Sequence, residues 1–300
     1  MENVKRVIWL TKGELNVGNF ILELDGYNVS YYEKGDCKNP TIVCLHGLAG
    51  SAVYSFSELS HKLADHFHLI LIDQPGHGKS TSFDKEADYL FSNLAVWYEK
   101  VIAYLLKKPF YLLGHSWGAD VSLHYAKHYP DKIKGVILLD GGYTFPKFQE
   151  EMTFITAYDG WSSYIDHSKY LNWEEIMGEY RTFTKRWNEE IEESVPSIFT
   201  KKEQYELIAS KFTVLSIIKA FFEEPFTNAY PYIQSPLLLI HATEPEELDT
   251  ARKKGISQLK NDITDTTIIS LGDTGHMIQW DKPEEVSSEI FRWVNNQEKS

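Results

Sequence analysis

The chain has 300 residues, 43% of them hydrophobic, which is enough for one large domain or for a core domain with an inserted lid. Its formal net charge of −13 argues against nucleic acid as a partner, because phosphates require a basic protein face. The first ten residues lack the features of a signal peptide and no 18-residue apolar run predicts a membrane span, so we expect a cytoplasmic protein.

Short runs rich in Leu, Ile and Val alternate with amphipathic stretches along most of the chain. An antiparallel hairpin is predicted first, with strands 20–24 and 28–33 around the turn Asp25-Gly26. Runs typical of strands buried on both faces of a parallel sheet follow at 41–45, 68–72, 110–113, 135–139, 236–240 and 266–270. Helices are expected between them, for example over 90–107, 118–129 and about 281–296. This alternation predicts an α/β fold with a mostly parallel central sheet flanked by helices.

The alternation stops after residue 142, and the following stretch has the pattern of helices only. We interpret residues 143–233 as a helical cap, or lid, inserted into a core made of residues 1–142 and 234–300. Asn172 and Glu175 fit the start of a long charged helix, as cap and third residue. The segment is dense in aromatic rings, and we expect most of them to pack the cap onto the core and a few to line a cavity.

Two cysteines, Cys37 and Cys44, lie seven residues apart. Cys44 falls within a buried strand run and Cys37 in a polar loop, so two free thiols are expected rather than a disulfide. No spacing of cysteine and histidine is typical of zinc, and we expect neither a metal nor another cofactor.

The strongest chemical signal is Gly114-His115-Ser116-Trp117-Gly118, a Gly-x-Ser-x-Gly motif between a buried strand and a helix. Such a turn holds the serine in a strained backbone conformation, and side chains at either glycine would collide with neighbouring elements. We therefore predict that Ser116 is a nucleophile.

Two further loops supply what a serine nucleophile needs. The loop His46-Gly47-Leu48 follows strand 41–45, and the backbone N–H groups of Leu48 and Trp117 are predicted to form an oxyanion hole. His46 is interpreted as bracing this turn. His276, in a Gly-His loop after the last strand, is the predicted base, because a serine hydroxyl attacks only after a base takes its proton.

A further segment, Asp73-Gln-Pro-Gly-His77-Gly-Lys-Ser, lies between the His46-Gly47-Leu48 loop and the motif around Ser116. Together these motifs resemble the α/β-hydrolase superfamily in order and spacing over essentially the whole chain. The resemblance implies an α/β-hydrolase fold and a serine hydrolase with a catalytic triad. It also implies that Asp73 and His77 belong to a structural turn, so neither is given a catalytic role.

The acid that would orient His276 has two candidates. In the resembled family it commonly follows the strand at 236–240, but this chain has Glu244-Pro245 there, and Glu244 serves only if the loop shifts by one residue. Asp140, 24 residues after Ser116, matches the acid position of haloalkane dehalogenases, which use aspartate where this chain has Ser116. Dehalogenation is therefore not expected. We favour Asp140, with Glu244 as the alternative.

The expected activity is hydrolysis of a carboxylic ester or lactone of a small to medium apolar substrate through an acyl-enzyme on Ser116. Two alternatives keep the same residues. One is a small-molecule receptor or regulatory protein on a hydrolase scaffold, and the other is a cofactor-free lyase or perhydrolase. The sequence leaves the oligomeric state undetermined.

Overall fold

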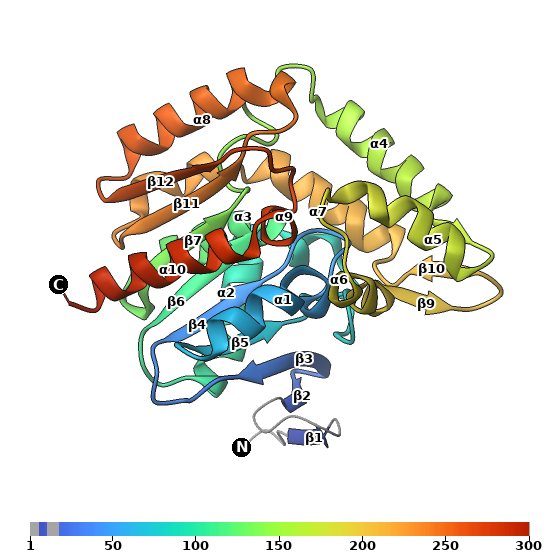
Figure 1. Cartoon of the computed structure of the whole chain (residues 1–300), viewed down its shortest axis with the longest axis horizontal. Coiled ribbons are helices and arrows are strands. Elements are labelled where there is room, and N and C mark those ends of the chain that lie inside the picture. Colours follow the sequence, from blue (N-terminus) through green and yellow to red (C-terminus); the bar gives the residue numbers. More distant parts are fainter. Residues whose placement is uncertain (1–5, 11–17, 300) are drawn as a thin grey trace.

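The computed structural model describes residues 6–10 and 18–299. Residues 1–5, 11–17 and 300 of the expected core fall outside this part of the chain. The described residues form a central nine-stranded sheet (Figure 1), with strand order β1-β2-β3-β5-β4-β6-β7-β11-β12. The strands are β1 (Arg6–Leu10), β2 (Gly18–Leu24), β3 (Tyr27–Lys34), β4 (Thr41–Leu45), β5 (His68–Ile72), β6 (Phe110–His115), β7 (Ile133–Leu139), β11 (Leu237–Ala242) and β12 (Thr266–Leu271).

The sheet is antiparallel at one edge and parallel elsewhere. β1, β2 and β3 pair antiparallel, as does β3 with β5, and every pair from β5 to β12 is parallel. All eight strands predicted from the sequence are confirmed, each end within two residues of its expected position. β1, which precedes the hairpin, was not predicted. In parallel strands the carboxyl ends all lie at one edge of the sheet, and the loops that carry function gather there.

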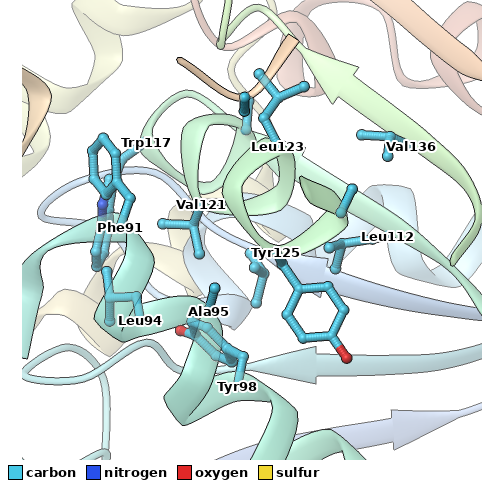
Figure 2. Packing of buried hydrophobic residues seen from close by; sticks show 14 of the residues in the cluster. Phe91, Leu94, Ala95, Tyr98, Leu112, Trp117, Val121, Leu123, Tyr125 and Val136 are labelled. Carbon is cyan, nitrogen blue, oxygen red and sulfur yellow. The ribbon is translucent and has the colours of Figure 1, made fainter. Parts of the chain in front are cut away.

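Alternate residues of the central strands face two separate hydrophobic clusters. Val43 and Leu112 pack with helices α2 (Phe91–Leu105) and α3 (Trp117–His128), whereas Cys44 and Leu113 pack with α1 (Ala52–Ala64) and α10 (Pro283–Gln297). Figure 2 shows the first cluster, with Leu112 and Val136 of the sheet against Val121 and Tyr125 of α3. Burial on both faces explains why these strands read as continuous apolar runs.

The segment between β7 and β11 contains α4 (Phe154–His167), α5 (Trp173–Tyr180), α6 (Glu189–Ser194) and α7 (Lys211–Glu223), and lies mostly beside one end of the sheet (Figure 1). The expectation of helices only is wrong, because a small antiparallel sheet joins β8 (Lys169–Tyr170), β10 (Tyr205–Leu207) and β9 (Phe199–Lys201). Strands of two or three residues are too short to show an alternating pattern.

Two local predictions in this segment have different outcomes. Asn172 caps α5 as expected, because its side chain accepts a hydrogen bond from the Glu175 N–H. The helix itself has eight residues and is not long, since the chain turns into a 3-10 helix at Arg181.

Two remaining helices complete the core: α8 (Asp249–Asp262), which precedes β12, and α9 (Ile278–Asp281), which precedes α10. Among the described residues no helix combines the length and apolar character needed to cross a bilayer. Both cysteines are free thiols, with Cys37 exposed and Cys44 buried.

Candidate active site

Ser116 occupies a sharp turn between β6 and α3. Its φ of 53° and ψ of −121° lie outside the regions that L-residues ordinarily adopt, so the backbone is strained. A Cβ atom at Gly114 would lie 2.2 Å from the Gly118 carbonyl oxygen, and one at Gly118 would lie 2.1 Å from that of Leu45. Both positions therefore require glycine, and the turn places Ser116 at the carboxyl edge of the sheet.

The predicted base and the favoured acid meet Ser116 in a continuous hydrogen-bonded chain. His276 Nε2 lies 2.9 Å from Ser116 Oγ, and His276 Nδ1 lies 2.7 Å from Asp140 Oδ2. Ser116 follows β6, Asp140 follows β7 and His276 follows β12. The sheet therefore brings His276 next to Asp140, which is 136 positions away in sequence, and next to Ser116, which is 160 positions away. The arrangement is that of a nucleophile, a base and the carboxylate that orients the base.

Asp140 is fixed by three donors. Its Oδ1 accepts hydrogen bonds from the Ala242 N–H at 3.0 Å and the Tyr143 hydroxyl at 2.9 Å, while Oδ2 receives His276. Burial alone would raise the pKa of Asp140, but these donors, above all His276, hold it below its ordinary value. Asp140 is therefore a carboxylate at neutral pH and can stabilise a protonated imidazole.

Glu244, the alternative acid, has other partners. Its carboxylate forms an ion pair with Lys185 at 2.7 Å, and its N–H donates to the Thr274 carbonyl. The buried Arg252 guanidinium donates to the carbonyl oxygens of Thr243, Glu244 and Pro245, which fixes this loop. The structure thus places Asp140, not Glu244, against His276.

The loop after β4 lies next to Ser116. A Cβ at Gly47 would be 3.1 Å from the Ser116 Cβ, and Leu48 lines the same cavities as Ser116. Trp117 begins α3, where backbone N–H groups have no intrahelical acceptor. The two predicted oxyanion donors therefore belong to the loop after β4 and to the first residue of α3, which directly follows Ser116.

Buried histidines brace this loop. His77 Nε2 accepts the Ala49 N–H at 3.1 Å, and His46 Nε2 accepts the Gln74 N–H at 2.9 Å. Burial lowers the pKa of His77 to about 4 and that of His46 well below its usual range, so both rings are neutral acceptors at neutral pH. Asp73 also braces the turn, because it accepts the Ala52 N–H at 2.9 Å.

Two residues that contact the triad were not singled out from the sequence. His115 Nε2–H donates to the His276 carbonyl at 3.0 Å, and burial lowers the pKa of His115 to about 3. Tyr143 donates to Asp140. His115 is adjacent to Ser116 in the motif and Tyr143 is three residues from Asp140. Closeness in sequence to Ser116 and Asp140 could have suggested these two residues, but it does not indicate which neighbouring side chains contact the site.

Two chambers meet at Ser116, and the residues that line both are Leu48, Ser116, Phe145, Trp161 and His276. The smaller chamber has a volume of about 220 Å³ and includes Trp117, Asp120, Asp140, Tyr143, Gln149, Ile218, Phe221 and Arg252 in its wall. The larger chamber has a volume of about 670 Å³ and includes Tyr54, Met152, Ala157, Gly160, Tyr164, Tyr180, Phe183, Ile198 and Met277. Within the described ranges no group of three or more His, Cys, Asp or Glu side chains is arranged to hold a metal ion.

Comparison with known proteins agrees with this architecture. Residues 40–283 match the family described as the alpha/beta hydrolase fold. The chain is 27% identical over 271 residues to the uncharacterized hydrolase YugF of Bacillus subtilis, covering 90% of this chain and 96% of that protein. It is 23% identical over 265 residues to the (E)-2-((N-methylformamido)methylene)succinate hydrolase of Acinetobacter baylyi, covering 88% and 93%.

The fold is shared with solved structures as well. The crystal structure of E-2-(acetamidomethylene)succinate hydrolase superposes on this chain with a TM-score of 0.73 at 20% sequence identity. The superposition covers 93% of this chain and 100% of that protein's chain. The match over residues 40–283 spans most of the sheet and the loops that carry Ser116, Asp140 and His276. The chain therefore belongs to the alpha/beta hydrolase fold family.

Proposed function

We propose that the protein is a serine hydrolase that cleaves a carboxylic ester or lactone, with Ser116 as nucleophile, His276 as base and Asp140 as the orienting acid. The observation that carries the proposal is the hydrogen-bonded chain Ser116–His276–Asp140, at 2.9 and 2.7 Å, in which Ser116 stands on a strained turn and lines both chambers. Nucleophile, base and orienting acid are each within hydrogen-bond distance of the next, which is the geometry that activates a hydroxyl.

The reaction would run in two halves. His276 Nε2 takes the Ser116 proton while Oγ attacks the carbonyl carbon, and the N–H groups of Leu48 and Trp117 stabilise the oxyanion. His276 then gives the proton to the leaving alkoxide oxygen as its bond to the carbonyl carbon breaks, which leaves the acyl group on Ser116. A water molecule that loses its proton to His276 attacks this acyl group, and the acid leaves as Ser116 recovers the proton.

Residues 143–233 contribute the cap in this proposal. Met152, Trp161 and Tyr180 belong to this segment and line the larger chamber. A volume of about 670 Å³ is within the usual range of small-molecule sites, roughly 300–1,000 Å³. We therefore infer a substrate with one large apolar part and one smaller part, joined at the scissile carbonyl.

A fluorophosphonate probe tests the nucleophile directly. The purified protein should be labelled at Ser116, as located by mass spectrometry, and both Ser116→Ala and His276→Ala should lose labelling and lower ester hydrolysis by about 10⁴-fold or more. Circular dichroism of each variant checks that the fold is retained.

Two results would contradict the proposal. A folded wild-type protein that is not labelled would favour a receptor on a hydrolase scaffold. A labelled Ser116 without cleavage of any nitrophenyl ester or lactone would favour a lyase or perhydrolase with the same triad.

A further inference from the structure

Asp120 is a buried acidic residue beside the triad that the reaction proposed above does not use. It lies in α3, four residues after Ser116, and its exposed fraction is 2%. Asp120 belongs to the first turn of α3, which begins directly after Ser116. Asp120 is one of the residues that line the smaller chamber, together with Trp117 and Tyr143.

The hydrogen bonds of Asp120 are incomplete. Its carboxyl group accepts backbone hydrogen bonds from Gly142 and from its own N–H, but Oδ1 is buried without a hydrogen-bond partner among the described residues. An unpaired buried oxygen is unusual and costs free energy, so its presence calls for an explanation. Burial also raises the pKa of Asp120 well above its ordinary value, and a neutral carboxyl group can both donate and accept.

Among the described residues that line this chamber, the buried charged groups other than Asp120 are already engaged, whereas the indole N–H of Trp117 is buried without a partner. Asp140 is bonded to His276, Ala242 and Tyr143. Arg252 donates to three backbone carbonyls of the loop after β11. The rest of the wall is mainly apolar, with Phe145, Trp161, Ile218, Phe221 and Leu248, and Gln149 is half-buried. A hydroxyl group of a ligand in this chamber would thus have Asp120 Oδ1 as a buried, unpaired acceptor.

We propose that Asp120 determines specificity by hydrogen-bonding a hydroxyl group on the smaller part of the substrate. The inference rests on the proposed function, because the substrate part in question is the one that Ser116 separates from the larger, apolar part. A dry cavity of about 150 Å³ holds benzene. The smaller chamber, at about 220 Å³, therefore accepts a short chain or small ring that carries the hydroxyl.

The preference for a hydroxyl group is tested with pairs of esters in which a hydroxyl group in one member is replaced by a methyl group in the other. Hexyl glycolate is compared with hexyl propanoate, and 2-hydroxyethyl hexanoate with propyl hexanoate, so that the hydroxyl lies on the acyl side or the alcohol side. In at least one pair the wild-type kcat/KM should favour the hydroxyl ester by about tenfold or more, the usual effect of satisfying a buried polar group.

Substitutions then assign the preference to Asp120. Asp120→Leu, similar in size but without hydrogen-bonding atoms, should lower this ratio by about tenfold, to the value set by the intrinsic reactivity of the two esters, and Asp120→Asn should keep a larger preference for the hydroxyl ester. Asp131→Asn, a matched change at an exposed aspartate, should leave the wild-type ratio unchanged. A residue that only braced Gly142 would lower both members of a pair equally.

The inference is overturned if the wild-type ratio is near one in both pairs, a result that needs no variant, or if Asp120→Leu folds and retains the wild-type ratio. In either case labelling of Ser116 by fluorophosphonate, together with cleavage of a nitrophenyl ester, would show that the proposed function still holds. Loss of labelling in the wild type would instead reject the proposed function itself.

Discussion

The carboxyl edge of the central sheet and the segment between β7 and β11 are built differently. Ser116 and Asp140 directly follow strands that are buried on both faces, and both have positive φ, at 53° and 42°. Such strain persists only where the surroundings over-determine the backbone. In α4, by contrast, Ala157 is the buried residue, and Phe154 and Ile155 are 38% and 69% exposed.

The contrast separates two tasks. The proposed chemistry depends on atoms held within a few tenths of an ångström, and the buried strands provide that rigidity. The shape of the larger chamber depends on α4, α5 and neighbouring turns, which pack through fewer buried side chains. Substitutions at the sheet edge should therefore change rate, whereas substitutions in α4 should change which substrates fit.

The largest effect is expected when the contact between Asp140 and His276 at the carboxyl edge of the sheet is broken. Asp140→Asn should lower kcat/KM for an ester by about 10⁴-fold, because the amide favours the wrong tautomer of His276. The measurement is steady-state ester hydrolysis, with circular dichroism as the check on folding.

Glu244→Gln is the matched control for that experiment, since Glu244 pairs with Lys185 at a largely exposed site. It should retain activity within a few fold. A larger loss in Glu244→Gln than in Asp140→Asn would reverse the assignment of the acid.

A smaller effect concerns stability. The pKa of Asp120 in the folded protein is raised above 3.8, its ordinary value. The free energy of unfolding is therefore not reduced by Asp120 below pH 3.8, where the carboxyl group is neutral in both states, and it falls as pH rises from 3.8 toward the pKa of the folded protein. Within that window the wild type loses up to about 1.4 kcal/mol per pH unit from this residue. Asp120→Asn cannot ionise, so its free energy of unfolding should increase relative to that of the wild type as pH rises above 3.8.

Urea unfolding of both proteins at each pH provides the measurement. Other buried groups, such as His77 and Asp73, titrate in both proteins and cancel in the difference. A difference that does not change with pH would mean that Asp120 titrates alike in the folded and unfolded chains.

The smallest effect lies in the segment between β7 and β11. Gly160 of α4 lines the larger chamber, and a Cβ there would meet nothing within 4 Å. Gly160→Phe should lower kcat/KM for long-chain esters by about tenfold relative to short-chain esters, because the ring takes up chamber volume. Measurement of an ester series from acetate to decanoate gives this ratio.

Gly178→Phe is the matched control, since Gly178 also lies in a helix of this segment with open space around it and lines neither chamber. It should leave the chain-length ratio unchanged. An equal change in both variants would show that the helices respond to any bulky residue and that the chamber itself is not being filled.

The central sheet could be predicted from the sequence more fully than the segment between β7 and β11. Long apolar runs predict buried strands, because strands covered on both faces have no polar side, and the motif around Ser116 depends on glycines that only a close backbone approach requires. In the segment between β7 and β11 the two- and three-residue strands were missed, because their pairing depends on distant neighbours and leaves no local period.

The sequence by itself determined the fold class, the order of the parallel strands along the chain and the candidates Ser116, His276, Asp140 and Glu244, since each rests on a local pattern. Only the tertiary structure placed Asp140 rather than Glu244 at His276, and only it brought Asp120 to the wall of the smaller chamber. The physical reason is that a hydrogen bond across 136 residues depends on how β7 and β12 align in the sheet, which no local pattern encodes.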